Sequence, residues 1–284
     1  MSERLGVRKT YKLVLNGAFP RSESGRSYEV LDAAGALLAN AAQASRKDLR
    51  DAVRAARAAQ PGWWGASAYN RGQVLYRVAE MAEARREELV DQVVAAEGVE
   101  RVHATATVER AIDRIVWFAG WTDKIAQVYG GTNPVAGPYF NFSIPSPSGV
   151  VGVVAPAEDS LLGLVETVMA PICAGNAVVV LASETRPIPA VLLGEMAATS
   201  DLPAGVLNVL TGRLAELAPV LADHEDVDGL DLAGAGEMRA DLAARGAGSI
   251  KRVLADDPRD PDAAALRRIR AFLETTTVWH TIGQ

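Results

Sequence analysis

The stretch GVVGVVAP (149–156) decides the fold, because it is an unbroken apolar run about one strand long. Such a run is typical of a strand buried on both faces, as in a parallel sheet. Similar runs follow at AVVVLAS (177–183), VLNVLTG (206–212) and VDGLDLAG (227–234). Helical patterns separate them at 160–174, 188–199 and 213–222. Strands alternating with helices at this spacing predict an α/β fold with a doubly wound parallel sheet.

The chain ahead of these strands predicts a different arrangement, of short strands followed by helices. A hairpin is predicted at 11–20 and short strands at 27–45. Ser45 and Asp48 fit a capping box, so a helix should begin there, and Pro61 should end it near Gln60. Two further helices are predicted, at 70–97 and 104–128.

Two β-rich segments lie outside both patterns. The first, within 138–148, alternates apolar and polar side chains and contains prolines, which favours an exposed edge strand. The second, at 275–282, is rich in Thr, Val and Trp. It follows the acidic connector DDPRDPD (256–262) and a short helix within 263–284. Because unpaired edge strands are prone to aggregation, both segments predict a partner.

Composition excludes several classes of protein. The 284 residues carry a net charge of −6, which argues against a non-specific nucleic-acid binder. One cysteine excludes an internal disulfide framework and a cysteine-rich zinc site, and we predict no metal ligands. The charged start does not resemble a signal peptide, and the apolar runs are too short or interrupted to span a membrane. We therefore expect a cytoplasmic protein without membrane contact.

The single cysteine, Cys173, is a candidate nucleophile. Free cysteine is also among the most buried residue types, and here it ends a predicted helix beneath the sheet. His103, His224 and His280 are scattered and form no sequence motif with it. We therefore interpret Cys173 as a core residue and predict no catalytic residue in this chain.

The order of several segments resembles that of the aldehyde dehydrogenase superfamily. The segments are LVLNGAF, PGWWGASAYNRGQVLYRVAEMAEARREEL, SPSGVVGVVAP, CAGNAVVV, LPAGVLNVLTG, HEDVDGLDLAGAGE and LETTTVWHTIG. The resemblance implies a Rossmann-type cofactor domain, a catalytic domain and a β-strand oligomerisation arm. It also implies NAD(P)-dependent oxidation of an aldehyde, in which a cysteine thiolate attacks the substrate.

Several positions depart from the family pattern. Glu158 replaces the asparagine that donates to the oxyanion, and a carboxylate has no such donor. Leu181 replaces a lysine, whereas Glu184 matches the carboxylate that holds the ribose. Gly212 and Gly234 remain from two glycine-containing turns. By resemblance, Glu184, Gly212 and Gly234 are the predicted cofactor-binding residues, as vestiges. We expect no cofactor to bind, with weak NAD or NADP binding as the alternative.

The largest departure is in length. The family has a whole catalytic domain where this chain has only the connector at 256–262. We predict an aldehyde dehydrogenase-like cofactor domain at 8–255, including the arm strand, followed by this linker. Residues 263–284 then form a short helix and the C-terminal oligomerisation strand. The chain is similar to the second, non-catalytic domain of class sixteen aldehyde dehydrogenases.

The resemblance leads to one main functional hypothesis and two alternatives. The main one is a non-catalytic subunit that stabilises, assembles or regulates an active NAD(P)-dependent aldehyde dehydrogenase. The predicted partner is a full-length subunit bound through strands 139–145 and 275–282, in a hetero-oligomer. The first alternative is NAD-dependent aldehyde oxidation within a mixed complex. The second is a nucleotide-binding sensor.

Overall fold

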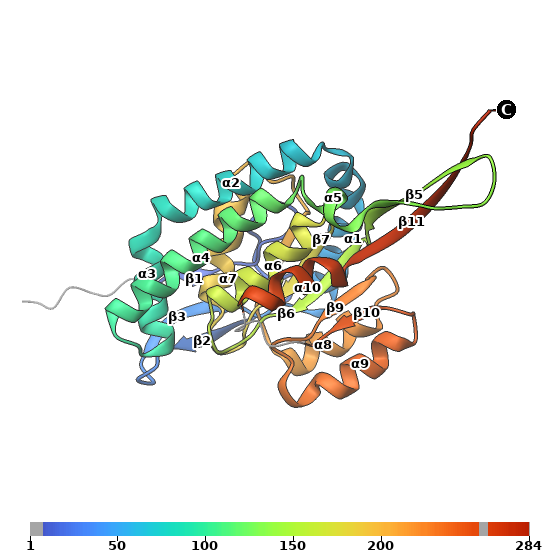
Figure 1. Ribbon diagram of the computed structural model, residues 1–284. Helices are drawn as coiled ribbons and strands as arrows, with labels where there is room; N and C mark the ends of the chain where they lie inside the picture. Colours follow the sequence, from blue (N-terminus) through green and yellow to red (C-terminus); the bar gives the residue numbers. More distant parts are fainter. Residues whose placement is uncertain (1–7, 256–260, 284) are drawn as a thin grey trace, which may run out of the picture.

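A five-stranded parallel sheet lies at the centre of the chain (Figure 1). The computed structural model describes residues 8–255 and 261–283. The strand order is β10-β9-β6-β7-β8, with β6 (Val150–Val154), β7 (Ala177–Leu181), β8 (Leu207–Leu210), β9 (Gly229–Asp231) and β10 (Arg252–Leu254). The chain winds from β6 out to β8 and then returns to the other side of β6. The predicted doubly wound sheet is therefore confirmed.

Helices cover both faces of this sheet, which explains why its strands are apolar throughout. Successive side chains of a strand point to opposite faces, so Val151 and Val153 enter one core and Val150 and Val154 the other. The first core is closed by α6 (Leu162–Cys173) and α7 (Ile188–Ala198). The second is closed by α1 (Arg46–Gly65), α8 (Leu214–Asp223) and α9 (Arg239–Ala247).

The N-terminal strands follow the prediction closely. Leu15 and Ala18 exchange two backbone hydrogen bonds, of 2.9 and 3.0 Å, around the tight turn predicted at Asn16-Gly17. Both turn residues have positive φ, as a hairpin turn of this kind requires. A separate three-stranded sheet contains β1 (Thr10–Tyr11), β2 (Ser27–Leu31) and β3 (Leu37–Ala42). Ser45 and Asp48 form the predicted capping box at the start of α1.

The predicted helix boundaries in this region need correction. Helix α1 continues through Pro61 to Gly65, because Trp63 is buried and its indole N–H donates to the carbonyl of Ile172 at 2.9 Å. The helix predicted at 70–97 breaks at Arg85, which forms ion pairs with Glu88 and Glu195. The resulting helices are α2 (Ala68–Ala84) and α3 (Arg86–Glu97). The helix predicted at 104–128 is also divided, into α4 (Arg101–Trp121) and α5 (Ile125–Tyr129).

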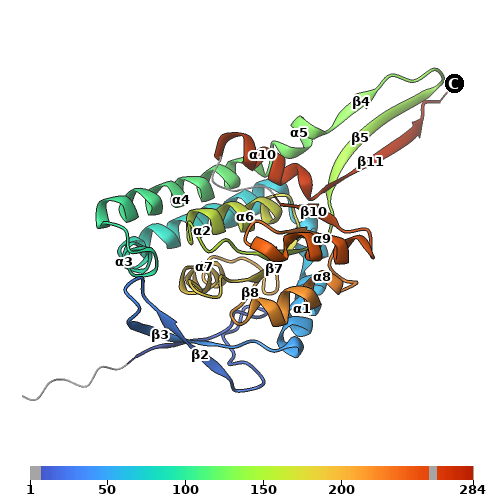
Figure 2. The same cartoon turned by 90° about the horizontal axis from the view of Figure 1, so that it is seen from below.

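A three-stranded antiparallel arm projects away from this body (Figures 1 and 2). Its order is β11-β5-β4, with β4 (Gly131–Asn133), β5 (Tyr139–Pro147) and β11 (Leu273–Thr281). The prediction that 138–148 is an edge strand is wrong, because β5 lies in the middle. Its prolines are tolerated since β4 pairs only with Asn141 to Ser143 and leaves Pro145 and Pro147 unpaired on that side.

Helix α10 (Pro261–Ala271) joins the body to the arm. It begins after residues 255–260, which follow β10, and it packs on α6. Arg268 of α10 forms an ion pair with Asp231 at the end of β9, and both side chains are fully buried. Most of the linker predicted at 256–262 lies outside the described residues, and its last two positions belong to α10.

Candidate functional site

The candidate site lies at the carboxyl edge of the parallel sheet, where doubly wound folds bind their ligands. The loops after β6, β7, β8 and β9 meet there, and each contains positions that the sequence singled out. Glu184 follows β7 and Gly212 follows the neighbouring β8, so these two lie close together. Gly234 follows β9, which is separated from β7 by β6. The three predicted cofactor residues therefore do not converge on one point.

Glu184 is engaged with the start of α8. Its Oε1 accepts a hydrogen bond from Arg213 Nη1 at 2.5 Å, and its Oε2 accepts one from the backbone N–H of Leu214 at 3.1 Å. The carboxylate thus caps the positive end of the helix. Its side chain is 31% exposed, so it remains accessible from the adjoining pocket.

That pocket has a volume of about 500 Å³ and opens between the β2–β3 hairpin and the ends of β7 and β8. Its wall includes Tyr28, Asp32, Glu184, Arg186 and Arg213. Burial raises the pKa of Tyr28, and Arg213 stacks over its ring at 5.3 Å from the centroid. A carboxylate and a guanidinium group on one wall suit a ribose and its phosphates, so Glu184 and Arg186 could hold a nucleotide.

Gly212 and Gly234 allow close packing of protein backbone. Gly212 has φ +149°, and a β-carbon there would lie 3.1 Å from the backbone nitrogen of Ala44. A β-carbon at Gly234 would collide with the carbonyl of Ala155. The Gly234 N–H donates to the Val154 carbonyl at 2.9 Å, which joins the loops after β9 and β6. Both glycines are therefore required by contacts within the chain.

The loop after β6 differs from the predicted helix start at residue 160. Helix α6 begins at Leu162, and Asp159 has φ +58° just before it. Glu97 of α3 anchors this loop by accepting hydrogen bonds from the Ser160 N–H at 2.7 Å and the Ser160 hydroxyl at 2.6 Å. Glu158 is exposed. Sequence reasoning missed Glu97, since no local pattern links it to a loop more than 60 residues away.

Cys173 is in the core, as predicted. It has no exposed surface, and its Sγ lies 3.1 Å from the carbonyl oxygen of Phe118. Burial raises the pKa of the thiol far above its usual range. The thiolate form, which is the nucleophile, is therefore strongly disfavoured in the folded protein.

Sequence reasoning also missed Arg186 and Arg213 as pocket residues. Arg213 directly follows Gly212 at the start of a predicted helix, and this position next to a candidate site was the available signal. Within 8–255 and 261–283, no group of three His, Cys, Asp or Glu side chains could hold a metal ion. The three histidines also lie on separate elements: α4, the end of α8 and β11.

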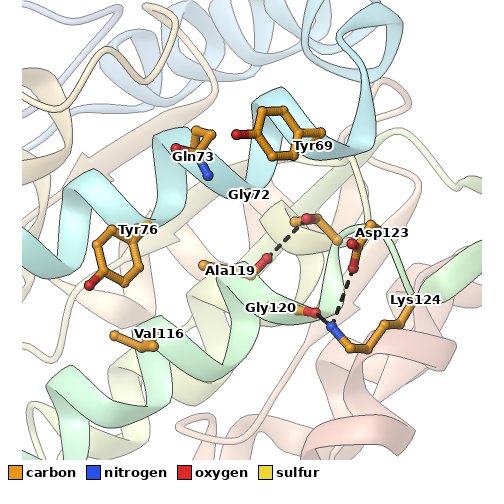
Figure 3. Close-up of a pocket in the computed structure, with 10 residues that line it drawn as sticks. Tyr69, Gly72, Gln73, Tyr76, Val116, Ala119, Gly120, Asp123 and Lys124 are labelled. Carbon is orange, nitrogen blue, oxygen red and sulfur yellow. Dashed lines mark hydrogen bonds and ion pairs between the residues drawn. The ribbon is translucent and has the colours of Figure 1, made fainter.

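A second pocket, of about 280 Å³, lies between α2 and α4 (Figure 3). Tyr69, Gln73 and Tyr76 of α2 line it opposite Val116 of α4. Lys124 turns back to the carbonyl of Gly120 and to Asp123, as Figure 3 shows. The charged side chains of this pocket, Lys124 and Asp123, thus bond to neighbours in the chain, and we assign the pocket no chemistry.

Comparison with known proteins identifies the family. The family described as "Aldehyde dehydrogenase family" matches residues 19–256. The chain belongs to the aldehyde dehydrogenase family. Retinal dehydrogenase 2 of Gallus gallus is 32% identical over 251 residues, which cover 86% of this chain and 48% of that protein. The chain spans about half the length of the curated relatives it matches.

Solved aldehyde dehydrogenase structures are similar to the chain in fold. The NAD-dependent aldehyde dehydrogenase from Sinorhizobium meliloti has a TM-score of 0.82 at 26% identity, with 88% of this chain and 50% of that chain covered. The NAD⁺ complex of aldehyde dehydrogenase from Bacillus cereus has a TM-score of 0.81 at 25% identity, with 86% and 50% covered. These similarities agree with the Rossmann-type cofactor domain predicted from the sequence.

The prediction that no cofactor binds is contradicted by these relatives. One is named as NAD-dependent, and another was solved as an NAD⁺ complex. The prediction rested on lost family residues such as the lysine replaced by Leu181, which is buried in β7. It gave too little weight to the retained fold and to the pocket beside Glu184.

None of the helices in residues 8–255 and 261–283 is both long and apolar enough to cross a bilayer.

Proposed function

We propose that this chain is a non-catalytic aldehyde dehydrogenase-like subunit that binds a complete family member and stabilises, assembles or regulates it. In this proposal the chain is a pseudoenzyme, similar to the second domain of class sixteen aldehyde dehydrogenases. It works in the cytoplasm as part of a hetero-oligomer. The observation that carries the proposal is an intact arm on a body whose only cysteine is buried.

The first support is the state of Cys173. The family reaction that the resemblance implies requires a cysteine thiolate that the aldehyde can reach. Cys173 is the only cysteine of the 284 residues, and it is fully buried beneath the sheet. Its Sγ lies 3.1 Å from the carbonyl oxygen of Phe118, a group that cannot take the thiol proton as a general base would. These residues therefore supply no nucleophile for aldehyde oxidation.

The second support is the short path from β10 to α10. Residues 255–260 connect them, whereas a domain needs about 50 residues or more. The helix that follows packs on α6 and buries the ion pair between Arg268 and Asp231. A buried pair of this kind stabilises the native state only when both partners are present. Helix α10 is therefore an integral part of the body at the position where the resemblance implies a catalytic domain.

The third support is the surface of the arm. On one face of the arm, Phe140 is 47% and Ile144 is 44% exposed, and on the other face Trp279 is 60% exposed. A three-stranded sheet this thin has no core of its own to bury these side chains. The outer edge of β11 is also unpaired among the described strands. Apolar side chains beside an open edge favour binding to another subunit by strand addition.

The test uses the purified full chain and a purified complete aldehyde dehydrogenase from the same cell. Size-exclusion chromatography with light scattering should detect a mixed complex. Ile144→Asp or Phe140→Asp should weaken it by about tenfold or more, since each change places a charge on an apolar surface that the complex would bury. Val102→Asp is the matched control, because Val102 is 66% exposed on α4, outside the arm.

Failure of the mixture to form a complex at micromolar concentrations would contradict the proposal. Equal weakening by Val102→Asp would also contradict it, because the effect would then not belong to the arm. The catalytic rate of the partner, measured with and without the chain, separates a regulator from a purely structural subunit.

A second candidate function is nucleotide binding, either as a sensor or as a contribution to aldehyde oxidation in a mixed complex. The pocket of about 500 Å³ beside Glu184, Arg186 and Arg213 favours it. If bound, NAD or NADP would supply a hydride acceptor, with Glu184 holding its ribose and Arg186 its phosphates. Calorimetry of the chain with NAD⁺ and NADP⁺ tests this function directly.

A further inference from the structure

In the pocket at the ends of β7 and β8, the carboxylate that is best placed to bind a ligand already forms an ion pair within the protein. Glu184 follows the second strand of the doubly wound sheet, and a carboxylate near this place is suited to accept the hydroxyls of a ribose. Its two oxygens already accept from Arg213 Nη1, at 2.5 Å, and from the Leu214 N–H, at 3.1 Å. A ribose would have to compete with the protein for this carboxylate.

The two contacts differ in how easily they can be exchanged. The Leu214 N–H belongs to the backbone of α8 and is fixed by the helix. The contact from Arg213 is made by its side chain, which is 47% exposed. The guanidinium also lies over the Tyr28 ring, 5.3 Å from the ring centroid. A change of side-chain rotamer can therefore release Arg213 from Glu184 without any change in the backbone.

We propose that Arg213 guards a nucleotide pocket, because its guanidinium occupies the Glu184 carboxylate that a ribose would bind through two neighbouring hydroxyls. The ligand class is a ribonucleoside phosphate, such as an adenine nucleotide. Arg186 lines the same pocket and is the second cation there, so it would face the phosphates; one of its nitrogens, Nη1, donates to the Ala157 carbonyl at 2.8 Å. This inference goes beyond the proposed assembly role and does not depend on it.

The strength of the guard follows from the two contacts that Arg213 makes. An exposed ion pair and a cation–π contact at the surface are each weak. Removing them should raise nucleotide affinity by about threefold to tenfold. If Arg213 instead bound the phosphates itself, its removal would lower nucleotide affinity. The direction of the change in affinity therefore decides between the two roles.

The experiment is isothermal titration calorimetry on the full chain with NAD⁺, ATP and 2′-deoxy-ATP. Arg213→Gln should bind NAD⁺ and ATP about threefold to tenfold more tightly than the wild-type chain, whereas Arg213→Lys, which keeps a cation, should resemble it. The gain for ATP should exceed the gain for 2′-deoxy-ATP, which lacks one of the two hydroxyls. Adding Glu184→Gln to Arg213→Gln should abolish the gain.

The matched control is Arg245→Gln. Arg245 forms exposed ion pairs with Asp241 and Asp223 on a different surface, so its loss should leave nucleotide affinity unchanged. Unchanged or weaker NAD⁺ binding by Arg213→Gln would overturn the inference. The absence of measurable nucleotide binding in both the wild-type chain and Arg213→Gln would overturn it as well. Neither result bears on assembly with a partner, which is measured without nucleotide.

Discussion

The buried ion pair between Arg268 and Asp231 provides the sharpest test of how α10 belongs to the fold. Both side chains are fully buried, one on α10 and the other at the end of β9. Arg268→Met removes the cation and leaves the buried Asp231 carboxylate with the hydrogen bond from the Ala233 N–H but without the guanidinium. Breaking a buried pair in this way costs about 3–5 kcal/mol. For a chain of this size, that corresponds to a fall in Tm of about 6–20 °C.

Two comparisons make this prediction specific. The double variant Asp231→Ala with Arg268→Met removes both charges, so it should recover most of the lost stability. Arg252→Met breaks an exposed pair with Glu274 that also joins the body to β11, and should cost no more than about 1 kcal/mol. Urea denaturation of all three variants supplies the free energies of unfolding. The reasoning about α10 would be refuted if Arg268→Met lowered the free energy of unfolding by less than about 1 kcal/mol. It would also be refuted if the double variant were no more stable than Arg268→Met.

Three further predictions concern single positions. Ile250 is 92% exposed with φ +58°, which strains a β-branched residue, so Ile250→Asn should stabilise the chain by about 1 kcal/mol in urea denaturation; a loss of stability would contradict this. Cys173 should react with a thiol reagent only after unfolding, and fast labelling of the native chain would show that the buried assignment is wrong. Burial lowers the pKa of His224 below 6.5, and its Nδ1 accepts from the Asp226 N–H at 3.2 Å, so its neutral form stabilises the fold. That contribution is present above pH 6.5 and lost below it, so the stability difference from His224→Ala should narrow as pH falls from 7.5 to 5; a constant difference would count against it.

The site was only partly predictable from the sequence. Glu184 was identified by its resemblance to a family position, and the structure places it on the wall of a pocket. Its partner Arg213 lies 29 positions away on the next loop, and no periodic pattern joins two loops at that separation. The prediction that no cofactor binds was wrong because it considered each replaced family residue separately. The retained fold and the pocket beside Glu184 together favour cofactor binding.

The sequence alone determined the features that depend on local pattern. Unbroken apolar runs such as 149–156 specify strands buried on both faces, and the Ser45–Asp48 box specifies the start of α1, because both signals lie within a few residues. Only the tertiary structure decided that β5 is central in the arm, since that depends on how far β4 extends beside it. The same holds for the buried pair of Arg268 with Asp231, which joins positions 37 residues apart. Burial and charge pairing arise between elements, so they depend on contacts that no short stretch of sequence contains.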